Sequence, residues 1–226
     1  MEALPTPGME ALLRDGRVWL GRGAQLAPPV IPTGFAALDR YLPGGGWPRN
    51  AISEIFLEQY GIGELTLLMP ALAELTRAED AAGRWIVWVA PPLVPYAPAL
   101  RRQGVELDRL LLVHPRGGRK NDLWAVEQAI RSGSAAAVLA WVRTADDVDL
   151  RRLQLAAEER VCWVVLFRPV EDLENRSPAA LRLELRAGAP MRGVRGRGAS
   201  RPRRALRVRV LKCRGRQPAD IDLEVR

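Results

Sequence analysis

The sequence predicts an α/β domain in which a mostly parallel sheet is flanked by helices. From residue 33 to about residue 180, short apolar runs alternate with longer segments of helical periodicity, which is typical of parallel strands joined by helices. Several runs are continuously apolar, as expected for strands buried on both faces. Beyond residue 180, apolar and polar side chains alternate strictly, which predicts antiparallel strands with one face in water.

Each expected element has a local signal. A short helix at Ala36–Tyr41 is expected to end before Pro43, because proline cannot continue a helix. Apolar runs predict strands at 51–56, 85–90, 110–113, 136–142 and 161–167. The segments between them predict helices at 64–80, 95–103, 121–132 and 146–159. Pro70 should kink the first long helix or delay its start. Alternating segments predict strands at Leu181–Arg186, Ala205–Cys213 and Ile221–Val225.

The chain is expected to have three regions. Residues 1–32 form an N-terminal extension, residues 33–186 the core, and residues 187–226 a basic loop with C-terminal strands that continue the core sheet. Within the extension, a compact apolar segment precedes a stiff, proline-rich connector. This segment either packs on the core of its own chain or docks onto another subunit. Its residues, Val18, Trp19 and Leu20, are therefore candidate partner-binding residues.

The segment Gly61-Ile62-Gly63-Glu64-Leu65 lies between a predicted buried strand and a predicted helix, where a phosphate-binding loop would lie. A working loop has the pattern G-x-x-x-x-G-K-[ST], whose lysine neutralises the phosphates and whose hydroxyl holds magnesium. Here Glu64 and Leu65 follow the last glycine. A carboxylate there would repel a phosphate by roughly 4 kcal/mol at about 4 Å and an effective dielectric of about 20. We therefore expect a degenerate loop, made of Gly61, Gly63, Glu64 and Leu65, and no cofactor.

No catalytic or metal-binding constellation is expected. His114 is the only histidine, which excludes Ser-His-Asp or multi-histidine arrangements or leaves them incomplete, and it is expected to be a structural or surface residue. Cys162 and Cys213 lie in apolar segments and are expected to be reduced core thiols. The acids at 146, 147 and 149 could suggest a cation site, but they lie where a helix would start, so helix capping is the favoured interpretation.

The net charge of +8 comes from one segment, because twelve arginines or lysines and no acid lie between Glu184 and Asp220. The part from Ala187 to Arg204 is rich in glycine, proline and arginine and is expected to be a long mobile loop. No aromatic residue occurs in 187–226, so we expect salt-sensitive contact with a DNA backbone without base stacking. An acidic protein partner and a solvated tail remain as alternatives. The candidate nucleic-acid-binding residues are Arg192, Arg195, Arg197, Arg201, Arg203, Arg204, Arg207, Arg209, Lys212 and Arg214.

Several motifs resemble the RecA recombinase core. They are Thr33-Gly34-x-x-x-Leu38-Asp39, then Gly44-Gly45-Gly46-Trp47-Pro48-Arg49, then Ser53-Glu54-Ile55, in the order in which they precede the phosphate loop of RecA-like proteins. A closer resemblance is to the ImuA proteins of the bacterial damage-inducible mutasome and to their relatives, the SulA-type division inhibitors. Its carriers are Trp19-x-Gly21-Arg22, Thr33-Gly34-Phe35-x-x-Leu38-Asp39, Leu42-Pro43-Gly44-Gly45-Gly46-Trp47-Pro48, and Gly61–Leu65 followed by Leu67-Leu68-x-Pro70-x-Leu72.

The resemblance implies a RecA-like core that acts as a non-catalytic accessory in error-prone translesion synthesis. Its implied partners are the Y-family-like polymerase subunit ImuB, an error-prone replicative-type polymerase and, as a further candidate, RecA itself. Where a RecA-type ATPase carries its magnesium-binding acid and its general base, this chain has Trp141 and Pro91-Pro92. The regions of RecA's DNA loops correspond to Arg143–Asp146 and Arg168–Ser177, and both look short.

Two other functions remain open: a SulA-type inhibitor that binds the tubulin-like division protein, and an ATP-dependent recombinase. No apolar run approaches the roughly 18 residues that a membrane-spanning helix needs, and the N-terminus lacks the pattern of a signal peptide. A cytoplasmic protein without membrane contact is therefore expected.

Overall fold

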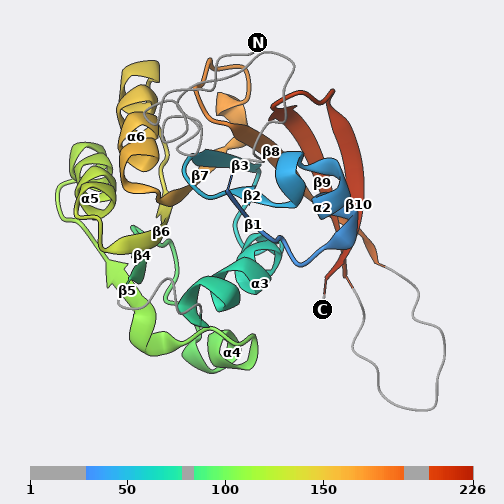
Figure 1. The fold of residues 1–226 in the computed structure, drawn as a ribbon, viewed down its shortest axis with the longest axis horizontal. Helices are drawn as coiled ribbons and strands as arrows, with labels where there is room; N and C mark the ends of the chain where they lie inside the picture. The colour runs from blue at the N-terminus through green and yellow to red at the C-terminus, as the bar shows by residue number, and fades with distance from the viewer. Residues whose placement is uncertain (1–28, 78–83, 191–203, 226) are drawn as a thin grey trace, which may run out of the picture.

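A computed structural model describes residues 29–77, 84–190 and 204–225 and contains an eight-stranded sheet covered by helices (Figure 1). The strands are β3 (Ile52–Leu57), β4 (Trp85–Val89), β5 (Leu110–Val113), β6 (Ala135–Trp141), β7 (Trp163–Pro169), β8 (Leu181–Pro190), β9 (Arg204–Cys213) and β10 (Ala219–Val225). Their order across the sheet is β10-β9-β8-β3-β7-β6-β4-β5. The six strands from β8 to β5 are parallel, whereas β9 pairs antiparallel with β8, and β10 pairs antiparallel with β9. The predicted fold class is confirmed.

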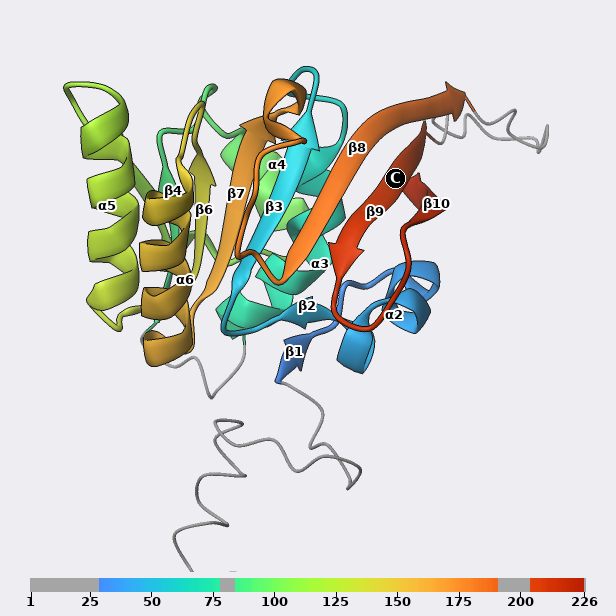
Figure 2. The same cartoon turned by 90° about the horizontal axis from the view of Figure 1, so that it is seen from above.

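Helices cover both faces of the sheet (Figure 2). One face packs on α2 (Ala36–Tyr41), α3 (Glu64–Arg77) and α4 (Ala97–Arg102), and the other on α5 (Arg119–Arg131) and α6 (Asp147–Arg160). Because the sheet lies between two helical layers, every residue of β3 and of β6 is buried. On β8, β9 and β10 only the face toward α2 and α3 is apolar, which explains why apolar and polar residues alternate along these strands.

Helix α3 runs without interruption from Glu64 to Arg77 with Pro70 inside it. Of the two expected effects of Pro70, the delayed helix start is therefore wrong, and the kink stays a prediction. Gly34 explains how the ring is accommodated, because a Cβ atom at this position would clash with the Pro70 side chain. The absent side chain lets the backbone before α2 pack directly on the proline ring.

Within the described residues, a strand already forms before the expected core boundary at residue 33. Val30–Ile31 forms β1, which pairs antiparallel with β2 (Trp47–Pro48). Ile31 is buried, and Trp47 is fully buried against Trp163 with ring centroids 5.4 Å apart. Val30 and Ile31 are flanked by prolines, so the sequence predicted a connector here. They form a strand because they pair with a segment at least sixteen residues further along the chain. The candidate partner-binding residues Val18, Trp19 and Leu20 lie outside the described residues.

Strand β8 continues into the segment that was expected to be a loop. The ladder with β9 pairs Ala187 with Leu206 and Pro190 with Arg204, so the expectation of a loop is wrong for residues 187–190. Main-chain pairing extends the strand there although the Ala187 side chain is exposed. Strand β8 is also parallel to β3 on its other side, so it joins the parallel and antiparallel parts of the sheet. The basic residues Arg192, Arg195, Arg197, Arg201 and Arg203 lie outside the described residues.

The connection from β7 to β8 crosses one face of the sheet. Both strands flank β3 and run parallel to it, so the chain must return over β3 between them. Residues 170–180 make this return on the same side of the sheet as α6 (Figure 2), and we call them the crossing segment. The structure holds no described helix long and apolar enough to span a membrane.

Both cysteines are buried free thiols, Cys162 at the start of β7 and Cys213 at the end of β9, as the sequence predicted. Burial raises the pKa of Cys162 from 9.0 to about 12, although nearby Arg84 opposes the shift. A thiol that ionises more easily when unfolded stabilises the fold fully below pH 9.0, and this stabilisation is lost as the pH rises toward about 12.

We therefore expect the free energy of unfolding to fall more between pH 8 and pH 10 for the wild type than for Cys162→Ala, by about 1 kcal/mol. Urea unfolding at the two pH values measures this difference. Equal pH dependence of the two proteins would contradict it.

Candidate functional site

The loop between β3 and α3 has the form of a phosphate-binding loop. Strand β3 ends at Leu57, and α3 begins at Glu64. Gly61 and Gly63 have φ values of 87° and 121°, in the left-handed region that glycine adopts readily. With these φ values, the backbone N–H groups of both glycines point toward the start of α3.

The acceptor for these N–H groups is the Glu64 side chain. Gly61 N–H donates to Glu64 Oε1 at 2.8 Å, and Gly63 N–H donates to Oε2 at 3.1 Å. The Glu64 residue is only 5% exposed, and Leu65 packs against the main core cluster. A carboxylate therefore fills the place at the helix N-terminus where a bound phosphate would lie, and its charge is stabilised by the helix dipole. The sequence predicted a degenerate loop with Glu64 in the place of the lysine, but not the hydrogen bonds from both glycines to its carboxylate.

Replacing Glu64 with alanine should lower the free energy of unfolding by about 1–2 kcal/mol, because two N–H groups lose their acceptor and α3 loses a charge at its N-terminus. Hydrogen exchange at Gly61 and Gly63 should become faster. Glu64→Gln keeps one acceptor oxygen and should lie between. Glu74→Ala, at an exposed position of the same helix, is the matched control and should change stability by less than about 0.5 kcal/mol. Unchanged stability and exchange in Glu64→Ala would contradict this account.

Tyr60 and Arg143 lie near the loop. Burial raises the pKa of Tyr60, the positive charge of Arg143 opposes this, and the negative charge of Glu64 adds to it. Arg143 is exposed and follows β6 at the carboxyl end of the parallel strands, in the region where the resemblance to RecA placed the first DNA loop. Among the described residues, Tyr60 thus lies between the positive charge of Arg143 and the negative charge of Glu64.

The two other positions of a RecA-type ATPase carry no acid. Trp141 at the end of β6 is buried, and its ring lies 4.7 Å from Phe167 and 5.6 Å from Trp88 between centroids. Pro91 and Pro92 follow β4. The position of the magnesium-binding acid is therefore part of the aromatic core, and that of the general base holds a side chain without a titratable group.

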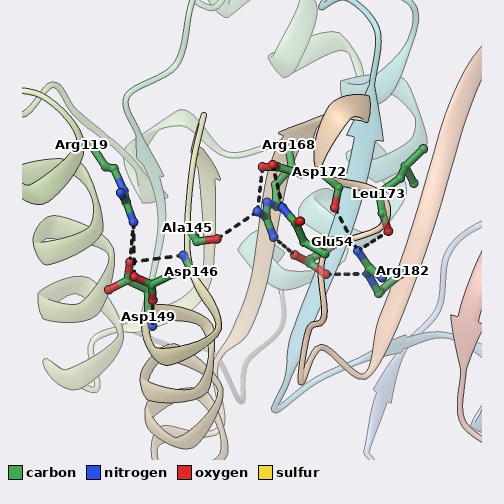
Figure 3. Close-up of polar contacts among 10 residues, drawn as sticks. Glu54, Arg119, Ala145, Asp146, Asp149, Arg168, Asp172, Leu173 and Arg182 are labelled. Atoms are coloured by element: carbon green, nitrogen blue, oxygen red, sulfur yellow. Dashed lines mark hydrogen bonds and ion pairs between the residues drawn. The ribbon is translucent and has the colours of Figure 1, made fainter.

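A buried ion-pair network lies under the crossing segment (Figure 3). The fully buried Glu54 carboxylate accepts from Arg168 Nη1 at 2.5 Å and from Arg182 Nε at 2.8 Å. Arg168 also donates to Asp172 Oδ2 at 2.7 Å and to the Ala145 carbonyl at 3.1 Å. Two arginines compensate one carboxylate on β3, and each reaches onward to another part of the chain.

The network fixes the crossing segment on the sheet. Arg182 donates to the Leu173 carbonyl at 3.1 Å, and Asp172 ends the short helical turn η4 (Val170–Asp172). The resemblance to RecA placed a second DNA loop at Arg168–Ser177, which overlaps the crossing segment; the Arg168 side chain is fully buried there. The sequence analysis did not predict this network, although Glu54, a charged residue within the mostly apolar run at 51–56, was a signal for it.

Three of the candidate nucleic-acid-binding residues, Arg207, Arg209 and Lys212, lie on a sheet face of mixed charge. Arg207 Nε lies 2.9 Å from Asp222 Oδ1, and Arg209 Nη1 lies 3.7 Å from Glu184 Oε2. Lys212 Nζ donates to the Ser177 carbonyl of the crossing segment at 2.9 Å. The two ion pairs of Arg207 and Arg209 lie at a groove of about 400 Å³, which is lined by Glu184, Arg186, Arg207, Arg209, Asp220 and Asp222.

Strand β10 supplies Asp220 and Asp222 to this face, because the ladder pairs Asp220 with Arg209 and Asp222 with Arg207. Glu184 on β8 is a further acid of the same face. These acids partner Arg207 and Arg209 only through the register of β8, β9 and β10, which the sequence alone does not establish. Arg214 is exposed after the end of β9, and nothing is described of the Arg204 side chain. DNA contact by these residues stays a prediction.

The acids at the start of α6 cap the helix, as predicted. The Asp146 side chain accepts from Asp149 N–H at 2.8 Å in a capping box, and Arg119 pairs with Asp149 at 3.1 Å (Figure 3). His114 is exposed after β5. Among the described residues, no group of histidine, cysteine, aspartate or glutamate is arranged to hold a metal ion.

The mostly parallel sheet with helices on both faces defines an α/β protein, and in its loop between β3 and α3 the Glu64 carboxylate accepts from the N–H groups of two glycines. The model of one family, described as "Cell division inhibitor SulA", matches residues 50–163, which is half of the chain. The chain belongs to this family.

Relatives of three kinds are similar to the chain. "Protein ImuA" of Caulobacter vibrioides is 33% identical over 150 residues, which cover 65% of this chain and 60% of that protein. SulA of Pseudomonas aeruginosa is 29% identical over 152 residues, covering 67% and 88%. RecA of Desulforapulum autotrophicum is 36% identical over 120 residues, covering 53% and 33%. The crystal structure of the Pseudomonas SulA superposes with a TM-score of 0.43 at 28% identity, covering 52% of this chain and 97% of that one. The resemblance to ImuA and SulA proteins is confirmed.

Proposed function

We propose that this protein is a non-catalytic, RecA-like accessory of a DNA-damage-inducible translesion synthesis complex. The observation that carries the proposal is the Glu64 carboxylate, which accepts from both glycine N–H groups of the loop where a nucleotide phosphate would bind. The similarity to ImuA supports the placement in a mutasome, although the chain spans only 60% of that relative's length. An ATP-dependent recombinase is the less favoured function, because Trp141 and Pro91-Pro92 occupy the other two reactive positions.

The proposed partners are ImuB, an error-prone replicative-type polymerase and RecA, with the DNA backbone contacted by the arginine-rich segment. Similarity to ImuA supports the first, and the charge of the segment supports DNA. Among the candidate cations, the five arginines in 191–203 are proposed to contribute most to DNA contact, because Arg207 is already paired with Asp222. A cytoplasmic location belongs to the same proposal.

Damage-induced mutagenesis tests this function. A strain of the source bacterium without the gene should show a strongly reduced mutation frequency after ultraviolet irradiation, and both the wild type and Glu64→Ala should restore it. Purified protein should retain ImuB in a binding assay with both components at defined concentration. Normal induced mutagenesis in the deletion strain would overturn the proposal.

The family match favours one alternative, a SulA-type inhibitor that binds the tubulin-like division protein. Controlled expression without DNA damage distinguishes the two functions. An inhibitor would produce filamentous cells and stop assembly of the purified division protein, whereas the mutasome accessory should leave both unchanged.

A further inference from the structure

The two edges of the sheet differ in how they are protected. An exposed edge strand offers unpaired N–H and C=O groups, and proteins usually blunt it with charged side chains. Strand β10 carries Asp220, Asp222 and Glu224. Strand β5, at the other edge, has the sequence Leu-Leu-Leu-Val without a charge, and within the described ranges it pairs only with β4 (Figure 1).

The side chains of β5 are apolar on both faces of the sheet and incompletely covered. Leu110 packs against the core cluster on the α3 side, and Val113 against the cluster on the α6 side. Between them, Leu111 is 46% exposed and Leu112 is 38% exposed. Nearby, the loop from β4 to α4 leaves three more apolar side chains in water, those of Leu93, Val94 and Tyr96.

The open edge has a definite hydrogen-bond register. The Val113 carbonyl accepts from Ala90 N–H at 2.8 Å, so the main-chain groups of Val113 face β4. Because these groups alternate along a strand, the N–H and C=O of Leu110 and Leu112 point toward the open side. An antiparallel strand could therefore form hydrogen bonds with both residues.

The charges around β5 indicate which strand fits. The exposed acids Glu106 and Asp108 precede it, with Arg109 between them and the strand, and the exposed bases Arg116 and Lys120 follow it. Antiparallel pairing of two identical strands brings the acidic end of one beside the basic end of the other. Parallel pairing would bring like charges together. Any contact made once in such a symmetric pair is also made a second time.

We propose that β5 is the interface with a second copy of this chain, in which the two sheets join through antiparallel pairing of their β5 strands. Leu111 lies on the twofold axis opposite its own copy, and Leu110 of each chain pairs with Leu112 of the other. The same register directs Glu106 toward Arg116 of the second copy. Leu93, Val94 and Tyr96 extend the apolar contact, since four-residue strands alone bury less than the roughly 1,600 Å² of a standard interface.

Sedimentation equilibrium of the full chain tests the assembly. The wild type should have twice the chain mass of 25.0 kDa. Leu112→Lys places a charge at the exposed edge and should raise the dissociation constant of the dimer at least about tenfold. Leu155→Lys is the matched control, because Leu155 is 65% exposed on α6, and it should leave the dimer unchanged. A wild type that stays monomeric up to about 100 µM overturns the proposal, and so does a dimer that Leu112→Lys does not weaken.

A cysteine cross-link tests the register independently. Residues directly opposite at a non-hydrogen-bonded antiparallel pair lie about 4.5 Å apart between Cα atoms, within reach of a disulfide. Leu111→Cys should therefore give a covalent dimer on mild oxidation, whereas Leu155→Cys should not. The native Cys162 and Cys213 are buried, so the wild type gives the background. A dimer broken by Leu112→Lys but not linked through Leu111→Cys would overturn the register with Leu111 on the axis.

Discussion

Replacing Glu54 with alanine is expected to lower the free energy of unfolding by about 3–5 kcal/mol, the usual cost of removing one partner from a buried ion pair. Glu54 and Arg168 have fully buried side chains, and Arg182 is nearly buried. Without the carboxylate, two guanidinium groups lose their central acceptor, and Arg168 keeps only Asp172 as an ionic partner. The crossing segment should loosen first. Urea unfolding, with hydrogen exchange in residues 170–180, measures both effects.

The control is an ion pair of the same kind at the surface. Arg151 lies 2.9 Å from Asp147, but both side chains are largely exposed. Arg151→Ala should therefore cost less than about 1 kcal/mol. A double-mutant cycle of Glu54→Ala with Arg168→Ala should give a coupling energy of about 1–3 kcal/mol. A loss from Glu54→Ala as small as that from Arg151→Ala would show that the network does not hold the fold.

Removing residues 191–203 is expected to weaken binding to a DNA backbone by about 100-fold at low salt. The segment carries five arginines, namely Arg192, Arg195, Arg197, Arg201 and Arg203. If each contacts one phosphate, the slope of log K against log salt should fall in magnitude by about 3.5–4.5. Pro190 and Arg204 are partners in the β8–β9 ladder, so an Asn-Gly turn can close the hairpin in place of the segment. Fluorescence anisotropy with single- and double-stranded DNA gives the affinities.

Deleting residues 191–203 tests the role of the charge more specifically than a truncation in front of β9 would. Leu206, Val208 and Leu223 are buried, so loss of β9 and β10 would remove part of the core together with the charge. Replacing the same five arginines with glutamine should reproduce the loss at full chain length. Arg101→Gln with Arg102→Gln, at exposed positions on α4, should leave the affinity unchanged. An unaltered salt slope after the deletion would favour the acidic-partner or solvated-tail alternatives.

The parallel core was predictable because its strands are continuous apolar runs separated by helical segments. That signal is local, so β3, β6 and β7 were found within two residues of their ends. An apolar run does not distinguish a strand in the interior of the sheet from a strand at its edge. The apolar run at 110–113 resembles the others in sequence, but it lies at an open sheet edge rather than in the interior. Position within a sheet depends on strand order, which no single run determines.

The elements and contacts that were missed depend on pairing between distant segments. Strand β1 exists only through β2, and the Asp222 that neutralises Arg207 is reached only through the register of β10. For the loop, the sequence predicts that phosphate chemistry is absent. Only the geometry of Gly61 and Gly63 reveals that Glu64 accepts from both N–H groups.

Whether Glu64 closes the loop against nucleotide can be measured by titrating the wild-type chain with magnesium-ATP in a calorimeter and by assaying hydrolysis with single-stranded DNA. We expect no binding up to about 1 mM and no turnover. Binding in the micromolar range, or DNA-stimulated turnover that is lost in Glu64→Ala, would contradict it.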